Sequence, residues 1–213
     1  MLPTIYNENK HDVKLYKNLF DNFKLPKDKI IIFYPAQFWA HKNHKYIIDA
    51  AEILKKENNE KYLFVFCGGK KENFKYIKNL IIKKQLDNSI KIFNYISDDE
   101  VISFYLNSDG VVMPTYCGPT NLPLYESFYF KKIIFYTEDL IPNDRINDHL
   151  IKIDISSPTD LCKKLNIYSD TKKIDEMVED NYDFYKLICN ENDFKDTYKK
   201  LLDDFSYLSN RWK

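Results

Sequence analysis

Glycine is scarce in this sequence, with four residues among 213: Gly68, Gly69, Gly110 and Gly118. Each one is informative, because glycine is kept where a backbone needs positive φ or a close approach. Cysteine is also rare, and its four positions form no Cys-x-x-Cys pair and lie near no histidine at ligand spacing. This arrangement argues against a zinc site and favours reduced thiols in a cytoplasmic protein.

Long hydrophobic runs and an excess of either charge are missing as well. No stretch of 18 apolar residues exists, and the first residues have the pattern of neither a signal peptide nor a membrane span. The 32 basic residues balance 32 acidic ones, so the net charge favours neither nucleic acid nor a strongly anionic membrane as a partner. No Asp-x-Asp pattern occurs, and we expect no metal site.

The whole sequence contains 44% hydrophobic and 30% charged residues, a composition typical of a folded domain with a packed core. From about residue 29 onward, short apolar runs alternate with longer amphipathic segments. The runs predict strands at 29–34, 62–67, 89–94, 110–113, 133–136 and 150–153. The segments between and after them predict helices at 43–56, 74–86, 98–107, 122–130, 159–165, 172–189 and 193–207.

This alternation predicts parallel βαβ units in a doubly wound, Rossmann-like sheet followed by C-terminal helices. Such sheets bind ligands beyond the carboxyl ends of their strands. We divide the chain into a linker with one helical piece at 1–28, a Rossmann-like domain at 29–190 and a C-terminal helix at 191–213. The ligand expected for the central domain follows from two of its loops.

Both loops come directly after a predicted strand. The first reads FYPAQFWAHKNH over residues 33–44, and the second reads MPTYCGPTNLPLYE over residues 113–126. Together they resemble the donor-binding domain of glycosyltransferase family 4, one half of the GT-B architecture of two facing Rossmann-like domains. The resemblance covers roughly residues 29–140, and the order, spacing and structural context of the two loops make it specific.

The resemblance implies roles for Lys42 and Glu126. Lys42 lies at a predicted helix N-terminus, where an ammonium and unpaired N–H groups face a diphosphate together. The family lysine contacts the donor phosphates and stabilises the leaving nucleoside diphosphate, which makes Lys42 the catalytic candidate. Glu126 matches the second glutamate of the E-x7-E motif, which binds the ribose hydroxyls. The alternatives are a solvated lysine and an ordinary glutamate near a helix start.

Two positions depart from the family pattern. Gly118 stands where the motif has its first glutamate, so no side chain there binds the transferred sugar. Gln37 stands where many relatives carry a phosphate-binding arginine, and it offers a hydrogen bond without a charge. As a substitute, we expect the sugar and phosphate to be held by the hydroxyl of Thr120 and the backbone N–H groups of Asn121 and Leu122.

Tyr95 and Ile96 follow the third strand, where this fold usually lets backbone groups meet the base; simple packing is the alternative. The implied reaction is transfer of a hexose from a UDP- or GDP-sugar to a hydroxyl, with retention at the anomeric carbon. Charge then builds on the departing phosphate, where fixed cations and N–H donors stabilise it. No further cofactor is expected, and the resemblance implies surface-polysaccharide assembly.

A complete family member has an acceptor domain before this one, and a first strand near residue 29 leaves no room for it. We expect that domain in cis or as a separate chain, peripheral membrane association through it, and nucleotide binding without turnover by this chain alone. A GT-B sugar-nucleotide epimerase and a noncatalytic doubly wound partner-binding module remain as alternatives. A receiver domain is disfavoured because residues 34–36 and 94–95 lack the required acids.

Overall fold

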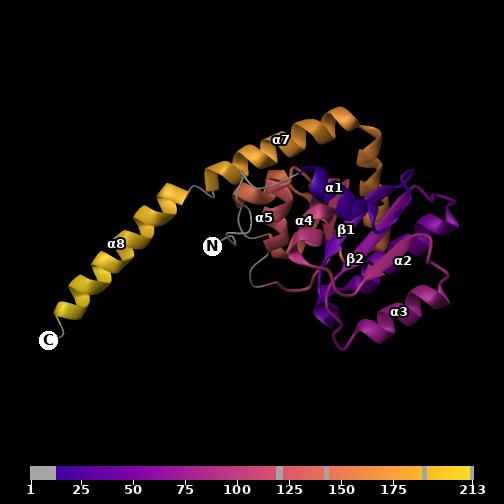
Figure 1. Ribbon diagram of the computed structural model, residues 1–213, viewed down its shortest axis with the longest axis horizontal. Helices are drawn as coiled ribbons and strands as arrows, with labels where there is room; N and C mark the ends of the chain where they lie inside the picture. The colour runs from indigo at the N-terminus through magenta and orange to yellow at the C-terminus, as the bar shows by residue number, and fades with distance from the viewer. Residues whose placement is uncertain (1–12, 119–121, 142–143, 189–190, 212–213) are drawn as a thin grey trace.

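The structure is a computed structural model that describes residues 13–118, 122–141, 144–188 and 191–211. Its centre is one six-stranded parallel sheet in the order β3-β2-β1-β4-β5-β6 (Figure 1). The strands are β1 (Ile30–Pro35), β2 (Tyr62–Cys67), β3 (Ile90–Phe93), β4 (Gly110–Met113), β5 (Ile133–Thr137) and β6 (Ile151–Ile153). The doubly wound sheet predicted from the sequence is therefore confirmed.

The helices connect the strands as the hydrophobic periodicity predicts. The α-helices are α1 (Val13–Asp21), α2 (His44–Lys56), α3 (Phe74–Lys83), α4 (Asp98–Asn107), α5 (Leu122–Tyr129), α6 (Pro158–Lys164), α7 (Thr171–Ile188) and α8 (Glu191–Asn210). Short 3₁₀ turns are η1 (Ala40–Lys42), η2 (Glu138–Leu140), η3 (Asp144–His149) and η4 (Leu165–Ser169). The bounds differ from the predicted ones by three residues or fewer, as expected for frayed ends.

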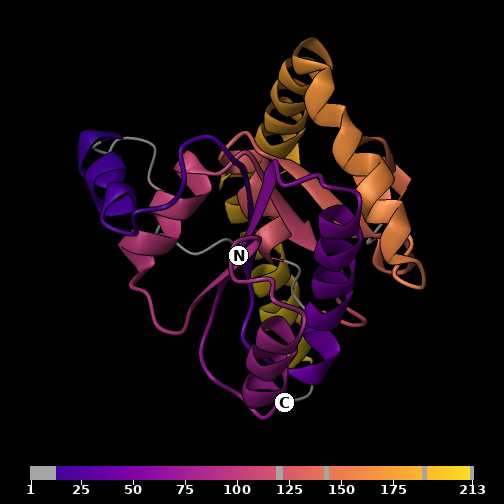
Figure 2. The ribbon, with the colours of Figure 1, turned by 90° about the vertical axis from the view of Figure 1, so that its right-hand side faces the viewer.

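The chain order explains which helices cover which face. From β1 it moves outward to β2 and β3, and then returns to place β4 beside β1. Right-handed crossovers put helices of the outward and returning connections on opposite faces. Figure 2 shows α1 and α4 on one side of the strands and α2 on the other. The adjoining carboxyl ends of β1 and β4 thus form the switch point at which such sheets bind ligands.

Burial accounts for the composition of the strands. All six residues of β2 are buried, because helices cover both faces of a parallel sheet. A capping box begins α4: the Ser97 hydroxyl accepts from the Glu100 backbone N–H, and the Glu100 carboxylate accepts from the Ser97 N–H at 2.7 Å. Ser157 precedes α6, but its side chain makes no capping hydrogen bond.

The segment before β1 contributes to the core through α1. The Ser103 hydroxyl of α4 donates to the Tyr16 carbonyl at 2.7 Å, and the ring of Phe20 meets Phe104 edge-on at 5.5 Å. Tyr16 is buried. The helical piece expected in residues 1–28 is therefore packed against α4, while the assigned domain boundaries stay a prediction.

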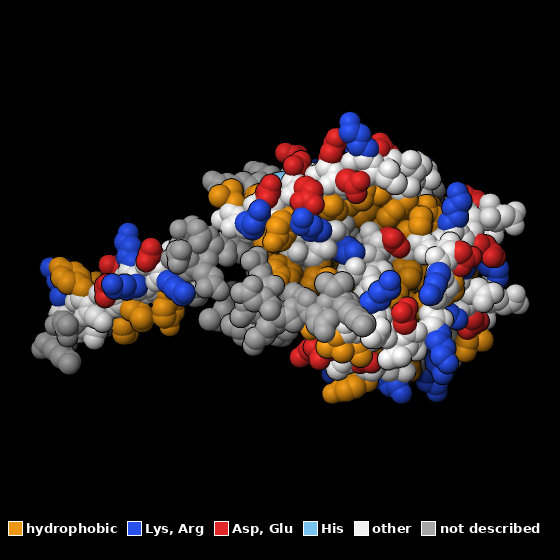
Figure 3. All heavy atoms as spheres, turned by 45° about the horizontal axis from the view of Figure 1, so that its top comes forward, with side chains coloured by type: hydrophobic (Ala, Val, Ile, Leu, Met, Phe, Trp, Pro, Cys, Tyr) orange, Lys and Arg blue, Asp and Glu red, His pale blue; other side chains and the backbone are white. Residues whose placement is uncertain are grey.

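The last helix, α8, extends away from the sheet (Figure 1). Large apolar side chains lie exposed along it, and Figure 3 shows hydrophobic atoms on its surface. These residues are Tyr198, Leu201, Leu202, Phe205, Tyr207 and Leu208, each at least half exposed. Within the described ranges, no helix is both long enough and apolar enough to cross a bilayer.

Candidate functional site

The loop between β1 and α2 carries Lys42 in the turn η1. Asn43 follows with φ of 52°, a left-handed conformation that asparagine tolerates, and α2 begins at His44. The Asn43 side chain makes no capping hydrogen bond to α2. The first N–H groups of a helix have no intrahelical partner, so this uncapped end favours a negatively charged group.

The loop after β4 lies directly against this turn. The Tyr116 backbone N–H donates to the His41 carbonyl at 2.9 Å, and the hydroxyl of the fully buried Thr115 lies 3.0 Å from the same oxygen. The Thr115 hydroxyl also lies 2.6 Å from the Cys117 carbonyl. The two loops singled out from the sequence are therefore bonded to each other at the switch point of the sheet.

Lys42 is half-buried at this junction. Burial lowers the pKa of its ammonium group, and the nearby Cys117 thiol opposes that shift in part. Cys117 itself is exposed, so the Lys42 ammonium lies beside a residue at the surface of the second loop. A partly desolvated cation interacts more strongly with an anion than a fully hydrated one does.

Glu126 lies half-buried on α5, one turn after the start of the helix. Its Oε2 atom accepts a hydrogen bond of 2.6 Å from the hydroxyl of Tyr105 on α4. The ring of Tyr105 is fully buried and stacks on Phe130 at 5.1 Å. Tyr105 was not among the predicted site residues. The sequence places this tyrosine on the buried face of a helix, but it does not show which residue the hydroxyl contacts.

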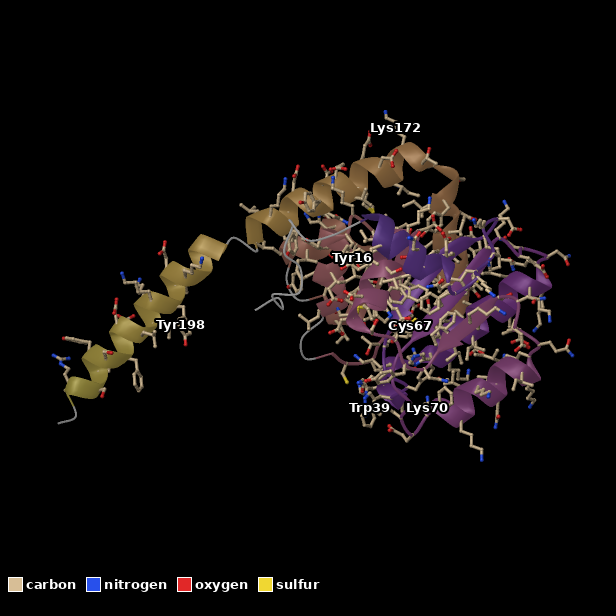
Figure 4. The ribbon with its side chains drawn as sticks, in the orientation of Figure 1. Tyr16, Trp39, Cys67, Lys70, Lys172 and Tyr198 are labelled. Carbon is tan, nitrogen blue, oxygen red and sulfur yellow. The ribbon has the colours of Figure 1, made fainter. Side chains whose placement is uncertain are left out.

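Gln37 is exposed, and its side-chain oxygen accepts a 2.9 Å hydrogen bond from the indole N–H of Trp39. The Lys71 ammonium lies 4.8 Å from the centre of the Trp39 ring. Figure 4 shows Trp39 and the neighbouring Lys70 at the same end of the molecule, on adjacent loops. The side chain of Gln37 is therefore bonded to Trp39, and Trp39 in turn contacts Lys71.

Gly68 permits the β1–α2 loop to approach β2 closely. A Cβ atom at Gly68 would lie 2.2 Å from the Ala36 carbonyl oxygen, so any other residue would displace that loop. Gly69 has open space at the same position, and its carbonyl accepts from the Phe38 N–H at 3.2 Å. The close approach required at Gly68 is therefore to the protein's own backbone.

The remaining predicted donor-site residues are placed as follows. Tyr95 is 94% exposed after β3, and Ile96 beside it is half-buried. Gly118 is half-buried, and Leu122 begins α5. Thr120 and Asn121 lie outside the described residues.

Buried polar atoms without a hydrogen-bond partner are concentrated at this edge. In the described part of the chain they occur in seven residues, and four of these, Asn43, His44, Asn94 and Thr137, lie at or after the carboxyl ends of strands.

His44 is fully buried and stacks on Phe38 at 4.5 Å. Burial lowers its pKa to about 3; the Ala36 backbone opposes this in part, and the charge of Lys42 adds to it. His44 is therefore a neutral core residue.

No group of His, Cys, Asp and Glu side chains suited to a metal ion occurs among the described residues. The two bonded loops carry the Lys42 ammonium, the uncapped start of α2 and the exposed Cys117 thiol, and the Glu126 carboxylate lies on the helix that follows the second loop. Cationic and N–H donors suit a diphosphate, and a carboxylate suits hydroxyl groups.

Comparison with known proteins gives one family and one fold. The family model for glycosyl transferases group 1 matches residues 16–183. No curated protein matches the sequence at a significant level. Among solved structures, the C-terminal domain of the glycosyl transferase group 1 family protein LpcC from Francisella tularensis is 20% identical, with a TM-score of 0.65 over 81% of this chain and 91% of that one.

Longer structures match over part of their length. HepE from Anabaena, solved with UDP and glucose, is 11% identical, with a TM-score of 0.73 over 89% of this chain and 53% of that one. A glycosyltransferase from Rickettsia africae is 21% identical, with a TM-score of 0.65 over 85% of this chain and 53% of that one. The chain thus spans about half the length of these two proteins.

Proposed function

Because the chain belongs to the glycosyl transferases group 1, we propose that it is the donor-binding domain of a retaining family 4 enzyme that uses a UDP- or GDP-hexose. One observation carries this proposal. The β4–α5 loop is bonded to the turn bearing Lys42, through the N–H of Tyr116 and the hydroxyl of Thr115 on the His41 carbonyl. A helix N-terminus with its lysine therefore adjoins the loop that leads into the helix of Glu126.

The proposed donor lies across this junction. Its diphosphate binds the Lys42 ammonium and the first N–H groups of α2, which no side chain of Asn43 occupies. Its ribose binds Glu126, since a carboxylate offers about four acceptor sites and the bond from Tyr105 fixes its orientation. The base lies near Tyr95 and Ile96, and the sugar near Gly118, Thr120, Asn121 and Leu122.

The proposed chemistry is departure of the nucleoside diphosphate with transfer of the hexose to a hydroxyl. Negative charge grows on the leaving phosphate as the glycosidic bond breaks, so a cation fixed beside it stabilises the transition state more than the ground state. Burial of Lys42 strengthens this interaction, because the effective dielectric constant is lower than in bulk water. No cofactor beyond the nucleotide sugar and no metal ion takes part in this proposal.

We assign the acceptor site to a second domain, present in cis or as a separate chain. Two features support this assignment: the chain spans about half of HepE, and α8 carries exposed apolar side chains such as Leu201 and Phe205, which a partner surface would cover. Under this proposal the chain alone binds nucleotide without turnover. Cytoplasmic placement, membrane association through the second domain and surface-polysaccharide assembly belong to the same proposal.

A noncatalytic partner-binding module is the second candidate. Gly118 lacks the side chain that would bind the transferred sugar, and the Gln37 oxygen is engaged by Trp39. Both observations reduce the contacts expected for a donor sugar. Such a module would use α8 as its interaction surface and would have no affinity for nucleotides.

Titration calorimetry with UDP and GDP separates the two candidates. We expect one of the two nucleotides to bind, and we expect Lys42→Ala and Glu126→Ala each to weaken that binding. The matched control is Lys56→Ala, at the opposite end of α2, where the Lys56 ammonium pairs with Glu52 at 3.2 Å. Absence of heat with both nucleotides at millimolar concentration would reject the donor-binding proposal and leave the partner-binding module.

A further inference from the structure

Two backbone carbonyls in the turn η1 accept hydrogen bonds from hydroxyl groups of neighbouring strands. The Tyr34 hydroxyl of β1 donates to the Lys42 carbonyl. The Thr115 hydroxyl, just after β4, lies 3.0 Å from the His41 carbonyl. The peptide units on both sides of the Lys42 Cα atom are therefore tied to the two central strands of the sheet.

Both hydroxyls are built into the core. Tyr34 is 1% exposed and Thr115 is 0% exposed, and burial raises the pKa of Tyr34 well above its ordinary value, so its phenol stays a neutral donor. An apolar side chain of similar size would fill either site without the cost of burying a hydroxyl. Packing alone therefore does not require a hydroxyl group at either position. The hydrogen bonds to the carbonyls of His41, Lys42 and Cys117 do require it.

The Thr115 hydroxyl has one hydrogen and faces two carbonyl oxygens, of His41 at 3.0 Å and of Cys117 at 2.6 Å. It therefore lies between the turn that carries Lys42 and the loop segment whose Cys117 thiol interacts with the Lys42 ammonium. One buried hydroxyl therefore joins the backbone of the Lys42 turn to the loop after β4.

We propose that Tyr34 and Thr115 are positioning residues for Lys42, holding its backbone so that the ammonium group stays at the junction of the two loops. This inference rests on the proposed function for its ligand, a nucleoside diphosphate. The hydroxyls do not touch the ligand in this arrangement. They act through Lys42 alone, and this makes their contribution separable from that of the lysine.

A double-mutant cycle with UDP as the probe tests the inference. Tyr34→Phe and Thr115→Val are each expected to weaken UDP binding by about three- to tenfold, the range for loss of one hydrogen bond. In the Lys42→Ala background the same substitutions should have no further effect, because nothing remains for them to position. Thr115→Ser keeps the hydroxyl and should bind UDP as the unmodified chain does.

The matched control is Tyr62→Phe. Tyr62 is also a buried tyrosine whose hydroxyl donates to a backbone carbonyl, that of Leu165 at 3.0 Å, but it begins β2 at the amino end of the sheet. It should lower stability to a similar extent and leave UDP affinity unchanged. Thermal unfolding of every variant separates loss of binding from loss of the fold.

A second readout does not need the nucleotide. Competitive acetylation of lysines across a pH series reports the pKa of Lys42, which burial holds below the ordinary lysine value. Tyr34→Phe and Thr115→Val should move that pKa toward the ordinary value as the turn loosens, and Tyr62→Phe should not. If the unmodified chain binds neither UDP nor GDP but these shifts occur, the proposed function fails and the positioning role stands.

Two results would overturn the inference. One is an unchanged acetylation profile of Lys42 in both hydroxyl variants. The other is a loss of UDP affinity in the Lys42→Ala background equal to that in the unmodified chain, since the hydroxyls would then act independently of the lysine.

Discussion

The hydroxyl of Tyr105, at the buried face of α4, donates a 2.6 Å hydrogen bond to the Glu126 carboxylate on α5. The bond joins two helices on the same face of the sheet, and it orients the carboxylate that we propose binds ribose. Charge-assisted hydrogen bonds of this kind are stronger than neutral ones. Tyr105 and Glu126 therefore form the first pair to test.

Glu126→Gln should weaken UDP binding and reduce the preference for UDP over 2′-deoxy-UDP, because the amide loses the charge that strengthens bonds from the ribose hydroxyls. The expected loss for UDP is roughly 10- to 150-fold, from about 1.5–3 kcal/mol per charge-assisted contact. Tyr105→Phe should weaken both nucleotides by a few fold and keep the preference. Calorimetry with UDP and 2′-deoxy-UDP measures the two affinities. An unchanged ratio of these affinities in Glu126→Gln would contradict the assignment of Glu126 to the ribose.

Lys42 should make nucleotide affinity depend on pH in the alkaline range. Burial lowers the pKa of Lys42 in the free protein, so its ammonium is lost at a lower pH than that of an ordinary lysine. UDP affinity should therefore fall as the pH rises through this lowered pKa. Lys42→Arg keeps the charge and should flatten the dependence. A pH profile of the dissociation constant that is the same in both proteins would exclude Lys42 as the phosphate-binding cation.

His44 should make the fold sensitive to acid. Its pKa is about 3 in the folded state against an ordinary value near 6.5, so the unfolded chain takes up a proton that the folded chain does not. The stability associated with neutral His44 is complete above pH 6.5 and declines toward pH 3, by at most about 1.4 kcal/mol per pH unit. His44→Leu should reduce this slope in urea unfolding at pH 6.5, 5.5 and 4.5. Equal slopes in both proteins would contradict a buried neutral histidine.

Cys117 offers a direct probe of the proposed site. It is exposed, whereas Cys67 and Cys162 are buried. In a chain carrying Cys189→Ser, N-ethylmaleimide should modify Cys117 faster than the other two, and saturating UDP should slow that reaction because the nucleotide lies beside Lys42. Peptide mass mapping of the modified protein gives the rates. Labelling of Cys117 that is indifferent to UDP, in a chain that binds it, would place the nucleotide elsewhere.

The apolar face of α8 should contribute little to the stability of the sheet domain. Leu201 and Leu202 are 63% and 51% exposed, so Leu201→Lys with Leu202→Lys should change the free energy of unfolding by less than about 0.5 kcal/mol. Leu124→Ala, at a fully buried position of α5, is the contrasting variant and should cost about 2–5 kcal/mol. Thermal unfolding measures this, and a large drop in the melting temperature of the lysine variant would show that α8 is packed.

The fold was predictable because its signals are local. The apolar run of β2 and the helical periodicity of α2 mark their own elements, and the capping box of α4 lies within four consecutive residues. Alternation of such elements then allows few topologies other than a doubly wound parallel sheet. The two loops at its carboxyl edge followed from the same reasoning.

The contacts within the site were decided by tertiary structure. Thr115 bonds the His41 carbonyl from 74 residues away, and Tyr105 bonds Glu126 from 21 residues away. Helical and strand periods determine which side chains share a face, but they do not determine which partner on another element a buried hydroxyl meets. That choice depends on packing and on satisfying each buried polar atom, and both exist only once the chain has folded.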